Sequence, residues 1–280
     1  MKKTLVYHIY LGDDIDTNLA YKVNLGCLKY YNDIFDKIRF VIVMDDLKDL
    51  ELREKGINWI NEIGFVGETE IIFRENTEIG EAATVRDYAV NLNIDKEDMV
   101  FWGHTKGIGN LRDEKVNKDS VLFWILVMYF YNLNFVDEVK NMFLGKGHAM
   151  EVFYGTLLMM HNNENMPVMI PKAHYSGSFY WINKPLLGKL DGYKKISDYT
   201  FSGRYDAEFY PGNLFKFDGL GGGMISHNNR VIALDKMLGV FYFMPEELWN
   251  KLLEVLGEKE EFLIFKKEIE QIIGFKIFEK

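Results

Sequence analysis

The stretch RFVIVMDD at residues 39–46 decides the fold predicted for this 280-residue chain, because an apolar run there ends directly in two carboxylates. Further short apolar runs occur at TLVYHIY (4–10), EIIF (70–73) and DMVFW (98–102), with helix-like segments between them. Strands that are apolar along their whole length are buried on both faces, as in parallel sheets covered by helices. The pattern predicts an α/β fold with a mostly parallel central sheet that binds ligands at the carboxyl ends of its strands.

The second half of the chain breaks this alternation and carries aromatic and glycine-rich segments instead. The chain has five prolines and no internal repeat or low-complexity tract that would mark a linker. After residue 245, apolar residues recur near helical spacing on either side of Gly257. We therefore predict a single domain over 1–280, with a nucleotide-binding half at about 1–110, an acceptor-binding and catalytic half at about 111–245, and C-terminal amphipathic helices at 246–280.

Charge and cysteine content argue against several classes of protein. Thirty-three Lys and Arg residues against 42 Asp and Glu give a formal charge of −9 and a pI near 5.3, whereas a general nucleic-acid binder needs clustered cations. Cys27 is the single cysteine and forms no internal disulfide.

The N-terminus lacks a signal-peptide pattern, and the most apolar run, at 121–131, is shorter than the about 20 residues of a membrane span. We expect a cytoplasmic protein with no transmembrane segment and a buried core helix at 121–131.

Two polar segments follow the second and third predicted strands. Asp45 and Asp46 end the second strand, where a carboxylate can accept hydrogen bonds from a base N–H or from ribose hydroxyls. The alternative is a solvated turn that caps the next helix. Arg86 ends NTEIGEAATVR (76–86) and can clamp a phosphate with two parallel hydrogen bonds; its alternative is a surface ion pair.

HTKG at 104–107 follows the fourth strand almost at once and is the sharpest motif. His104 could ligate a metal ion or donate a hydrogen bond to an oxygen, and Lys106 supplies a positive charge for a diphosphate. A histidine after a strand is often a structural hydrogen-bonding residue. Its clustering with a lysine and a glycine favours function.

HYSGSFYW at 174–181 is dense in aromatic and small residues. Aromatic faces stack on sugar rings, and serine or glycine lets a ligand approach the backbone, so His174, Ser176 and Trp181 are candidates for sugar contact. A buried aromatic hairpin is the alternative. His227, which follows a run of three glycines, could reach a diphosphate or a metal ion; a loop histidine without a role is an equal alternative.

RYDAE at 204–208 places two carboxylates beside an arginine. Asp206 and Glu208 are two residues apart and do not share a helix face, so one carboxylate can point into a cleft while the other bonds to the scaffold. A carboxylate held near a substrate hydroxyl is a plausible general base. The alternative is an acid-rich first turn of a helix.

Taken in order, these segments resemble the GT-A type glycosyltransferases. VIVMDD (41–46) and DMVFW match the general family, and HTKG, HYSGSFYW and RYDAE are similar to the HTKG, SGNFWW-like and R-x-x-A-E segments of a bacterial polysaccharide-locus subgroup. The resemblance covers roughly residues 4–215. It implies a single-domain, Rossmann-like GT-A fold and a hexosyltransferase that moves a sugar from a nucleotide-sugar donor to a glycan or lipid-linked glycan acceptor by direct, inverting displacement. Such an acceptor is compatible with a cytoplasmic protein that associates peripherally with the inner face of the membrane.

The resemblance also implies roles on the donor side. Asp45 or Asp46 would contact the base or ribose of the nucleotide. His104 and Lys106 stand where most GT-A enzymes carry an Asp-x-Asp that binds a divalent ion, so a requirement for Mn²⁺ or Mg²⁺ is left open by this sequence.

On the acceptor side, Glu208, with Asp206 second, matches the position of the acceptor-activating carboxylate. His174, Ser176, Trp181 and Arg204 would contact the acceptor. A non-catalytic carbohydrate- or nucleotide-binding module on the same fold is the main alternative function. A hydrolase is disfavoured, because glycosidase carboxyls flank the bond at about 5–10 Å from each other and neighbours two residues apart rarely do.

Overall fold

The computed structural model describes residues 1–93, 99–145, 152–155, 158–160, 173–175, 179–194, 199–214, 225–227 and 259–277. The strands are β1 (Lys3–Tyr10), β2 (Lys37–Met44), β3 (Glu68–Glu75), β4 (Met99–His104), β5 (Phe153–Gly155), β6 (Leu158–Met160), β7 (Ala173–Tyr175), β8 (Tyr180–Asn183) and β9 (Ile225–His227). The helices are α1 (Leu19–Tyr30), α2 (Leu50–Asn61), α3 (Glu81–Thr84), the π-helical turn η1 (Val85–Ala89), α4 (Ile108–Leu111), α5 (Lys118–Leu133), α6 (Val136–Phe143), α7 (Lys184–Lys194), α8 (Asp206–Leu214) and α10 (Lys259–Ile273).

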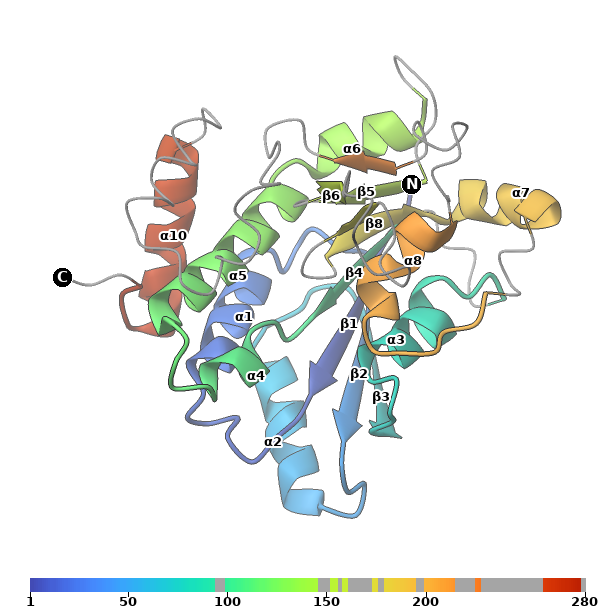
Figure 1. The fold of residues 1–280 in the computed structure, drawn as a ribbon. Helices are drawn as coiled ribbons and strands as arrows, with labels where there is room; N and C mark the ends of the chain where they lie inside the picture. The colour runs from blue at the N-terminus through green and yellow to red at the C-terminus, as the bar shows by residue number, and fades with distance from the viewer. Residues whose placement is uncertain are drawn as a thin grey trace.

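The central sheet has seven strands in the order β3-β2-β1-β4-β8-β5-β9 (Figure 1). Its first four strands are parallel, with β1 between β2 and β4 and with β3 beside β2. β8 runs antiparallel to both of its neighbours, β4 and β5, and β9 is parallel to β5. The structure thus confirms the predicted α/β fold with a mostly parallel central sheet.

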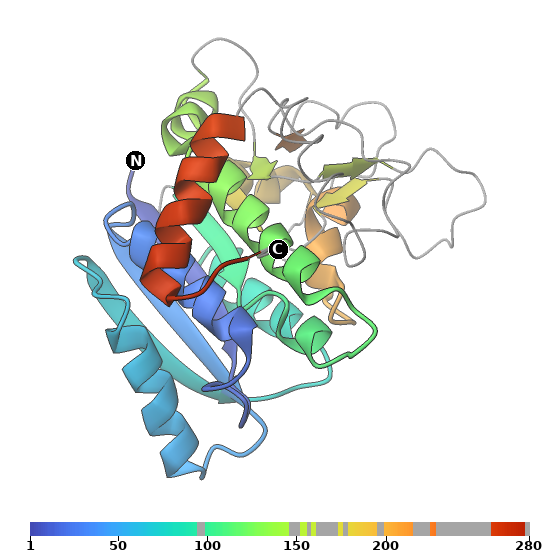
Figure 2. The ribbon, with the colours of Figure 1, turned by 90° about the vertical axis from the view of Figure 1, so that its left-hand side faces the viewer.

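Helices cover both faces of the sheet, and each face has its own hydrophobic cluster. The larger cluster joins Tyr7 and Phe101 to residues of α1, α5 and α10, which lie side by side on one face (Figure 2). The smaller cluster joins Val6 and Trp102 to residues of α3, η1, α7 and α8. Alternate residues of β1 and β4 therefore reach opposite cores, as the two-residue period of a strand requires.

Helix α5 is the predicted core helix, and it is buried all round from residue 120 to residue 133. The ring of Phe130 on α5 contacts the rings of Phe262 and Phe265 on α10, and the ring centroids are 5.3 and 5.5 Å apart. In the described part of the chain, no single helix is both long and apolar enough to cross a membrane; α5 and α6 pass such a test only as a pair, and this pair bends by 48°.

Two predicted helices differ from expectation in extent or fall outside the description. The helix-like segment expected between the runs at 70–73 and 98–102 becomes helical only at Glu81, because Thr77 and Gly80 close a turn through a 2.8 Å backbone hydrogen bond, and it ends in the π-helical turn η1. The amphipathic helix expected around 262–272 is α10, with Phe262, Phe265 and Ile269 buried. The helix expected around 248–255 lies outside the described residues.

Candidate functional site

The candidate site forms where β1 and β4 end beside each other. The strand register pairs His8 of β1 with His104 of β4, so both imidazoles lie on the face of the smaller core cluster, one step beyond Val6 and Trp102. Both histidines are buried, at 5% and 7% exposure. Carboxyl ends of parallel strands meet at one edge of a sheet, where ligands of α/β proteins bind.

A tight turn after β4 aims Lys106 at this edge. Gly107 has a φ of +86°, a left-handed conformation that glycine adopts without steric cost. A Cβ there would lie 2.9 Å from side-chain atoms of both Val121 and Ile125 on α5. From α1, the buried Asn24 amide donates to the backbone oxygen of Lys106 at 3.0 Å. The HTKG segment is therefore fixed by its backbone and by the helices beneath it.

Lys106 and Glu208 face the same cavity, which has a volume of about 540 Å³. Its lining comes from β1, the segment before α3, the HTKG turn, α4 and the start of α8; we call it the Lys106 cavity. The Lys106 ammonium lies 3.7 Å from a carboxylate oxygen of Glu208 and 4.4 Å from the ring centroid of Trp124. Lys106 is only 9% exposed, so a positive charge and a carboxylate stand in a site where water screens them poorly.

A second buried pair forms the floor of this cavity. Nδ1 of His104 lies 2.8 Å from Oε2 of Glu81, and because a carboxylate only accepts, the ring donates its Nδ1 proton. Burial alone would raise the pKa of Glu81, but attraction to His104, the hydrogen bond from it and the nearby Lys106 charge lower this pKa to about 2. Glu81 is thus ionised at neutral pH and orients the imidazole, in the manner of carboxylate–histidine pairs.

His8 lies next to this pair as a neutral imidazole. Its Nδ1 is 2.9 Å from the hydroxyl oxygen of Thr84, and burial lowers its pKa to about 3. At neutral pH the floor therefore holds one anionic carboxylate and one neutral imidazole beside His104.

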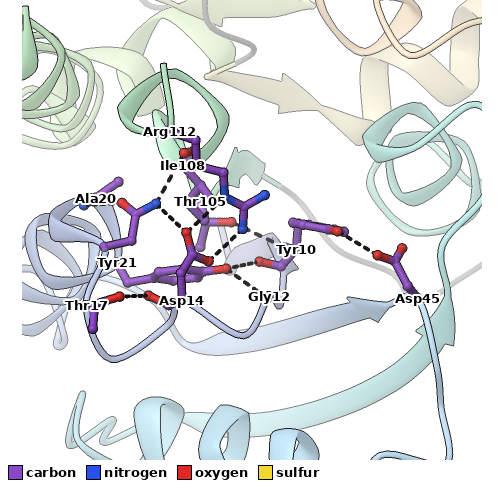
Figure 3. Close-up of polar contacts among 11 residues, drawn as sticks. Tyr10, Gly12, Asp14, Thr17, Ala20, Tyr21, Asp45, Thr105, Ile108 and Arg112 are labelled. Atoms are coloured by element: carbon purple, nitrogen blue, oxygen red, sulfur yellow. Dashed lines mark hydrogen bonds and ion pairs between the residues drawn. The ribbon is translucent and has the colours of Figure 1, made fainter. Parts of the chain in front are cut away.

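A second cavity of about 530 Å³ opens beside the first, beyond the ends of β1 and β2. Five aspartates line it, and we call it the acidic cavity: Asp13, Asp14, Asp45, Asp46 and Asp49. Asp45 accepts a hydrogen bond from Tyr10 Oη at 2.8 Å (Figure 3) and another from Asn76 Nδ2 at 2.9 Å. The bond from Asn76, followed by that from Tyr10, lowers the pKa of Asp45.

The structure brings several of the predicted residues together. His104, Lys106, Arg204 and Glu208 all line the Lys106 cavity, although their segments lie about a hundred residues apart in the sequence. Asp45 and Asp46 line the adjoining acidic cavity. Asp46 also accepts the backbone N–H of Lys48 at 2.8 Å, so the turn expected as its alternative is present, but Asp49 and not Asp46 caps the next helix, α2.

Two other predicted residues, Arg86 and Asp206, are not brought to the site. Arg86 lines neither cavity, and its guanidinium pairs with Asp87 at 2.6 Å. Asp206 accepts hydrogen bonds from the backbone N–H groups of Ser202 and Gly203 at 2.6 and 2.9 Å, so it holds the loop before α8.

Trp181 corrects an expectation, because it is a core residue. Its side chain is fully buried, its indole N–H donates to the backbone oxygen of Asn132 at 2.8 Å, and its ring lies 5.0 Å from that of Phe101. The expected acceptor contact is wrong for this tryptophan, and the alternative of buried aromatics holds for Phe179, Tyr180 and Trp181. The side chains of His174, Ser176 and His227 lie outside the described residues.

Four residues of the site were missed from the sequence: His8, Tyr10, Glu81 and Arg112. His8 had a usable signal, since it is a polar residue within an otherwise apolar strand. Glu81 lies within NTEIGEAATVR (76–86), a segment in which only Arg86 was singled out. Arg112 follows the HTKG turn by a few residues, but nothing in the local sequence points its side chain to the cleft.

The described residues form no preassembled side-chain site for a divalent cation. Mg²⁺ and Mn²⁺ take sets of oxygen ligands, and in the described part of the chain no group of three or more His, Cys, Asp or Glu residues could hold a metal ion. At the position of the Asp-x-Asp motif, His104 and Lys106 are present instead, and each pairs with a nearby carboxylate: His104 with Glu81 and Lys106 with Glu208.

No protein-family model matches this sequence, and no curated protein matches it. Among solved structures, the chain is similar to residues 1–349 of TarS from S. aureus, with 12% sequence identity, 98% of this chain and 81% of that chain covered, and a TM-score of 0.35. A likeness at that score carries no argument about activity, so the function proposed below rests on the geometry of the site.

Proposed function

We propose that this protein is a glycosyltransferase that moves a sugar from a nucleotide-sugar donor to a hydroxyl group of a glycan acceptor. The observation that carries the proposal is the pairing of Lys106 with Glu208 in one cavity at the carboxyl ends of β1 and β4. A cation that can hold a departing diphosphate and a carboxylate that can take a hydroxyl proton are the two groups such a transfer needs.

Donor binding would separate the two groups. In the structure the Lys106 ammonium is 3.7 Å from Glu208, and a diphosphate is the stronger partner because it carries more negative charge. Once Lys106 binds the diphosphate, the Glu208 carboxylate is released toward the acceptor. Lys106 then binds the leaving group on one side of the sugar, and Glu208 serves as the general base on the other.

In the transfer itself, Glu208 takes the proton of the acceptor hydroxyl while the hydroxyl oxygen attacks the anomeric carbon. The bond from that carbon to the diphosphate oxygen breaks, and the electron pair leaves with the nucleoside diphosphate. Lys106 stabilises the charge that develops on this leaving group. The anomeric configuration inverts, because attack and departure occur on opposite faces of the carbon. Glu81 acts as a positioning residue, since it orients His104 beside Lys106.

The test begins by measuring binding of a panel of nucleotide sugars and then transfer or slow hydrolysis of the tightest binder. Glu208→Gln keeps the shape of the side chain and removes its basicity. We expect kcat to fall by roughly 10²–10⁴, with donor affinity unchanged or slightly tighter because a negative charge beside the diphosphate is lost. Asp206→Asn is the matched control, since that carboxylate serves the loop at 202–203.

Two outcomes would contradict the proposal. A folded Glu208→Gln variant that binds donor and keeps near-wild-type kcat would remove Glu208 from the chemistry. A wild-type protein that binds a nucleotide sugar tightly but turns it over neither with acceptors nor with water would instead favour a binding module on this fold.

A further inference from the structure

The Lys106 cavity and the acidic cavity meet at two residues, Tyr10 and Arg112, which line both. The Arg112 guanidinium lies 5.8 Å from the ring centroid of Tyr10, and Figure 3 shows both side chains above the loop that follows β1. A ligand that fills both cavities therefore has to pass these two side chains.

The charges of the two cavities are unequal. Among the described residues, five aspartates and Arg112 are the charged groups that line the acidic cavity. In the Lys106 cavity, Lys106, Arg204 and Arg112 accompany three glutamates. A phosphate is repelled by the first arrangement and attracted by the cations of the second, whereas base N–H groups and ribose hydroxyls can donate to aspartates. A nucleotide that spans the cleft would then have its phosphates on the Lys106 side of Arg112.

Arg112 is held at this junction by a bidentate contact with Asp14. Its Nε and Nη2 atoms donate to the two carboxylate oxygens of Asp14 at 2.9 and 2.6 Å, and this pairing lowers the pKa of Asp14. Asn18 donates both to Asp14, at 2.9 Å, and to the backbone oxygen of Ile108, at 3.2 Å. The loops after β1 and β4 are thus tied together around the guanidinium, whose Nη1 atom takes no part in the contact with Asp14.

Gly12 makes room for this contact. A Cβ at residue 12 would lie 2.6 Å from Nη2 of Arg112 and 3.0 Å from Oδ1 of Asp14. Only a residue without a side chain lets the ion pair lie flat against the loop.

We propose that Arg112 is a second phosphate-binding cation, which grips the diphosphate of the donor at the junction while Lys106 binds it deeper in the cleft. The inference rests on the proposed function, because it takes the ligand to be a nucleoside diphosphate or its sugar ester. A guanidinium presents its N–H groups in a plane that matches two phosphate oxygens. Arg112 can use Nη1 for this purpose and keep Asp14, or it can exchange Asp14 for the ligand.

The test measures dissociation constants by isothermal titration calorimetry. UDP, GDP, ADP, CDP and dTDP are screened, and the tightest binder is taken on together with its free nucleoside. For Arg112→Gln we expect roughly tenfold or weaker binding of the diphosphate, with nucleoside affinity changed by less than about twofold. Arg53→Gln, at an arginine that packs on Phe73 and lines neither cavity, is expected to change neither value.

The outcomes separate this inference from the proposed function. Unchanged diphosphate affinity in Arg112→Gln, or an equal loss for diphosphate and nucleoside, would overturn the role of Arg112. If Lys106→Ala still lost diphosphate affinity in that case, the proposed function would stand without it. If the wild-type protein bound none of the five diphosphates, both would fall.

The variant Gly12→Ala tests the same proposal in a second way, because it displaces the guanidinium without replacing Arg112. The new Cβ would displace the flexible end of the arginine, so we expect a melting temperature within a few degrees of wild type and a loss of diphosphate affinity in the same direction as for Arg112→Gln. Gly188→Ala on α7, where a Cβ meets only Leu92 at 3.8 Å, is the matched control. Wild-type affinity in a folded Gly12→Ala variant would contradict the placement of the guanidinium.

Discussion

At the scale of single residues, the site depends on two buried titratable groups, of which one is ionised and the other neutral at neutral pH. Glu81 is ionised with a pKa of about 2 because His104 and Lys106 stabilise its charge against burial. His8, which pairs with His104 across β1 and β4, is neutral because burial lowers its pKa to about 3. Both shifts mean that the unfolded chain binds more protons than the folded one as the pH falls, so both make the protein less stable in acid.

The His8 shift predicts a pH dependence of stability that can be separated from that of Glu81. Between pH 6.5 and pH 3 the unfolded chain takes up a proton at residue 8 that the folded chain refuses, so the free energy of unfolding falls with pH. From pH 7.5 to pH 5.0 this amounts to about 2 kcal/mol, while a glutamate with an ordinary pKa of 4.5 or lower hardly contributes.

The variant His8→Asn retains a polar group near Thr84 and removes the titration. Urea unfolding at pH 7.5 and pH 5.0 should show that the variant loses about 2 kcal/mol less than the wild-type protein over this interval. An equal loss in the two proteins would show that His8 titrates normally in the folded state.

At the scale of elements, strand ends were predictable and the partners that meet there were not. The runs at 39–44 and 98–102 marked β2 and β4, and the polar residues directly after them are at the cleft. The contacts of His104 with Glu81 and of Arg112 with Asp14 depend on strand register and on how loops fold back. Local spacing carries no information about either.

Trp181 shows why an aromatic segment does not by itself distinguish a core strand from a ligand-binding one. It lies in β8, between β4 and β5, and all four residues of β8 are buried. In a strand covered on both faces, the two-residue alternation that separates an exposed side from a core side is lost. An aromatic residue there has the same pattern whether it serves the core or a ligand.

The packing of helix α10 indicates that it belongs to the main core, and a substitution at its buried face tests this. The Phe265 ring contacts those of Tyr30, Tyr31 and Phe130, with centroids 5.1 to 5.6 Å away. We expect Phe265→Ala to cost about 3–5 kcal/mol of unfolding free energy and to shift one cooperative urea transition seen by both circular dichroism and tryptophan fluorescence.

Leu263→Ala is the control on the same helix, since Leu263 is 41% exposed and its truncation should cost well under about 1 kcal/mol. A Phe265→Ala protein that unfolds in two steps, with the later step at the wild-type midpoint, would show that α10 folds independently. That result would argue against the single domain expected from the sequence.

At the scale of the whole molecule, the sheet brings to one cleft residues that the chain keeps far apart. The α/β class and the mostly parallel sheet followed from the alternation of apolar strands and helices, and the structure confirms them. The cleft itself lies over the ends of β1, β2 and β4, with a cationic group in one cavity and aspartates in the next. This division is the physical basis of the proposal that a sugar nucleotide binds along the cleft.

The central claim is that Lys106 binds the diphosphate of a nucleotide-sugar donor, and calorimetric titration of Lys106→Ala tests it most directly. Using the nucleotide sugar that binds the wild-type protein most tightly, we predict at least about a tenfold rise in Kd, because a charge-assisted phosphate contact contributes about 1.5–3 kcal/mol. Titration of the folded variant with the same Kd as the wild-type protein would contradict the placement of the donor and, with it, the proposed mechanism.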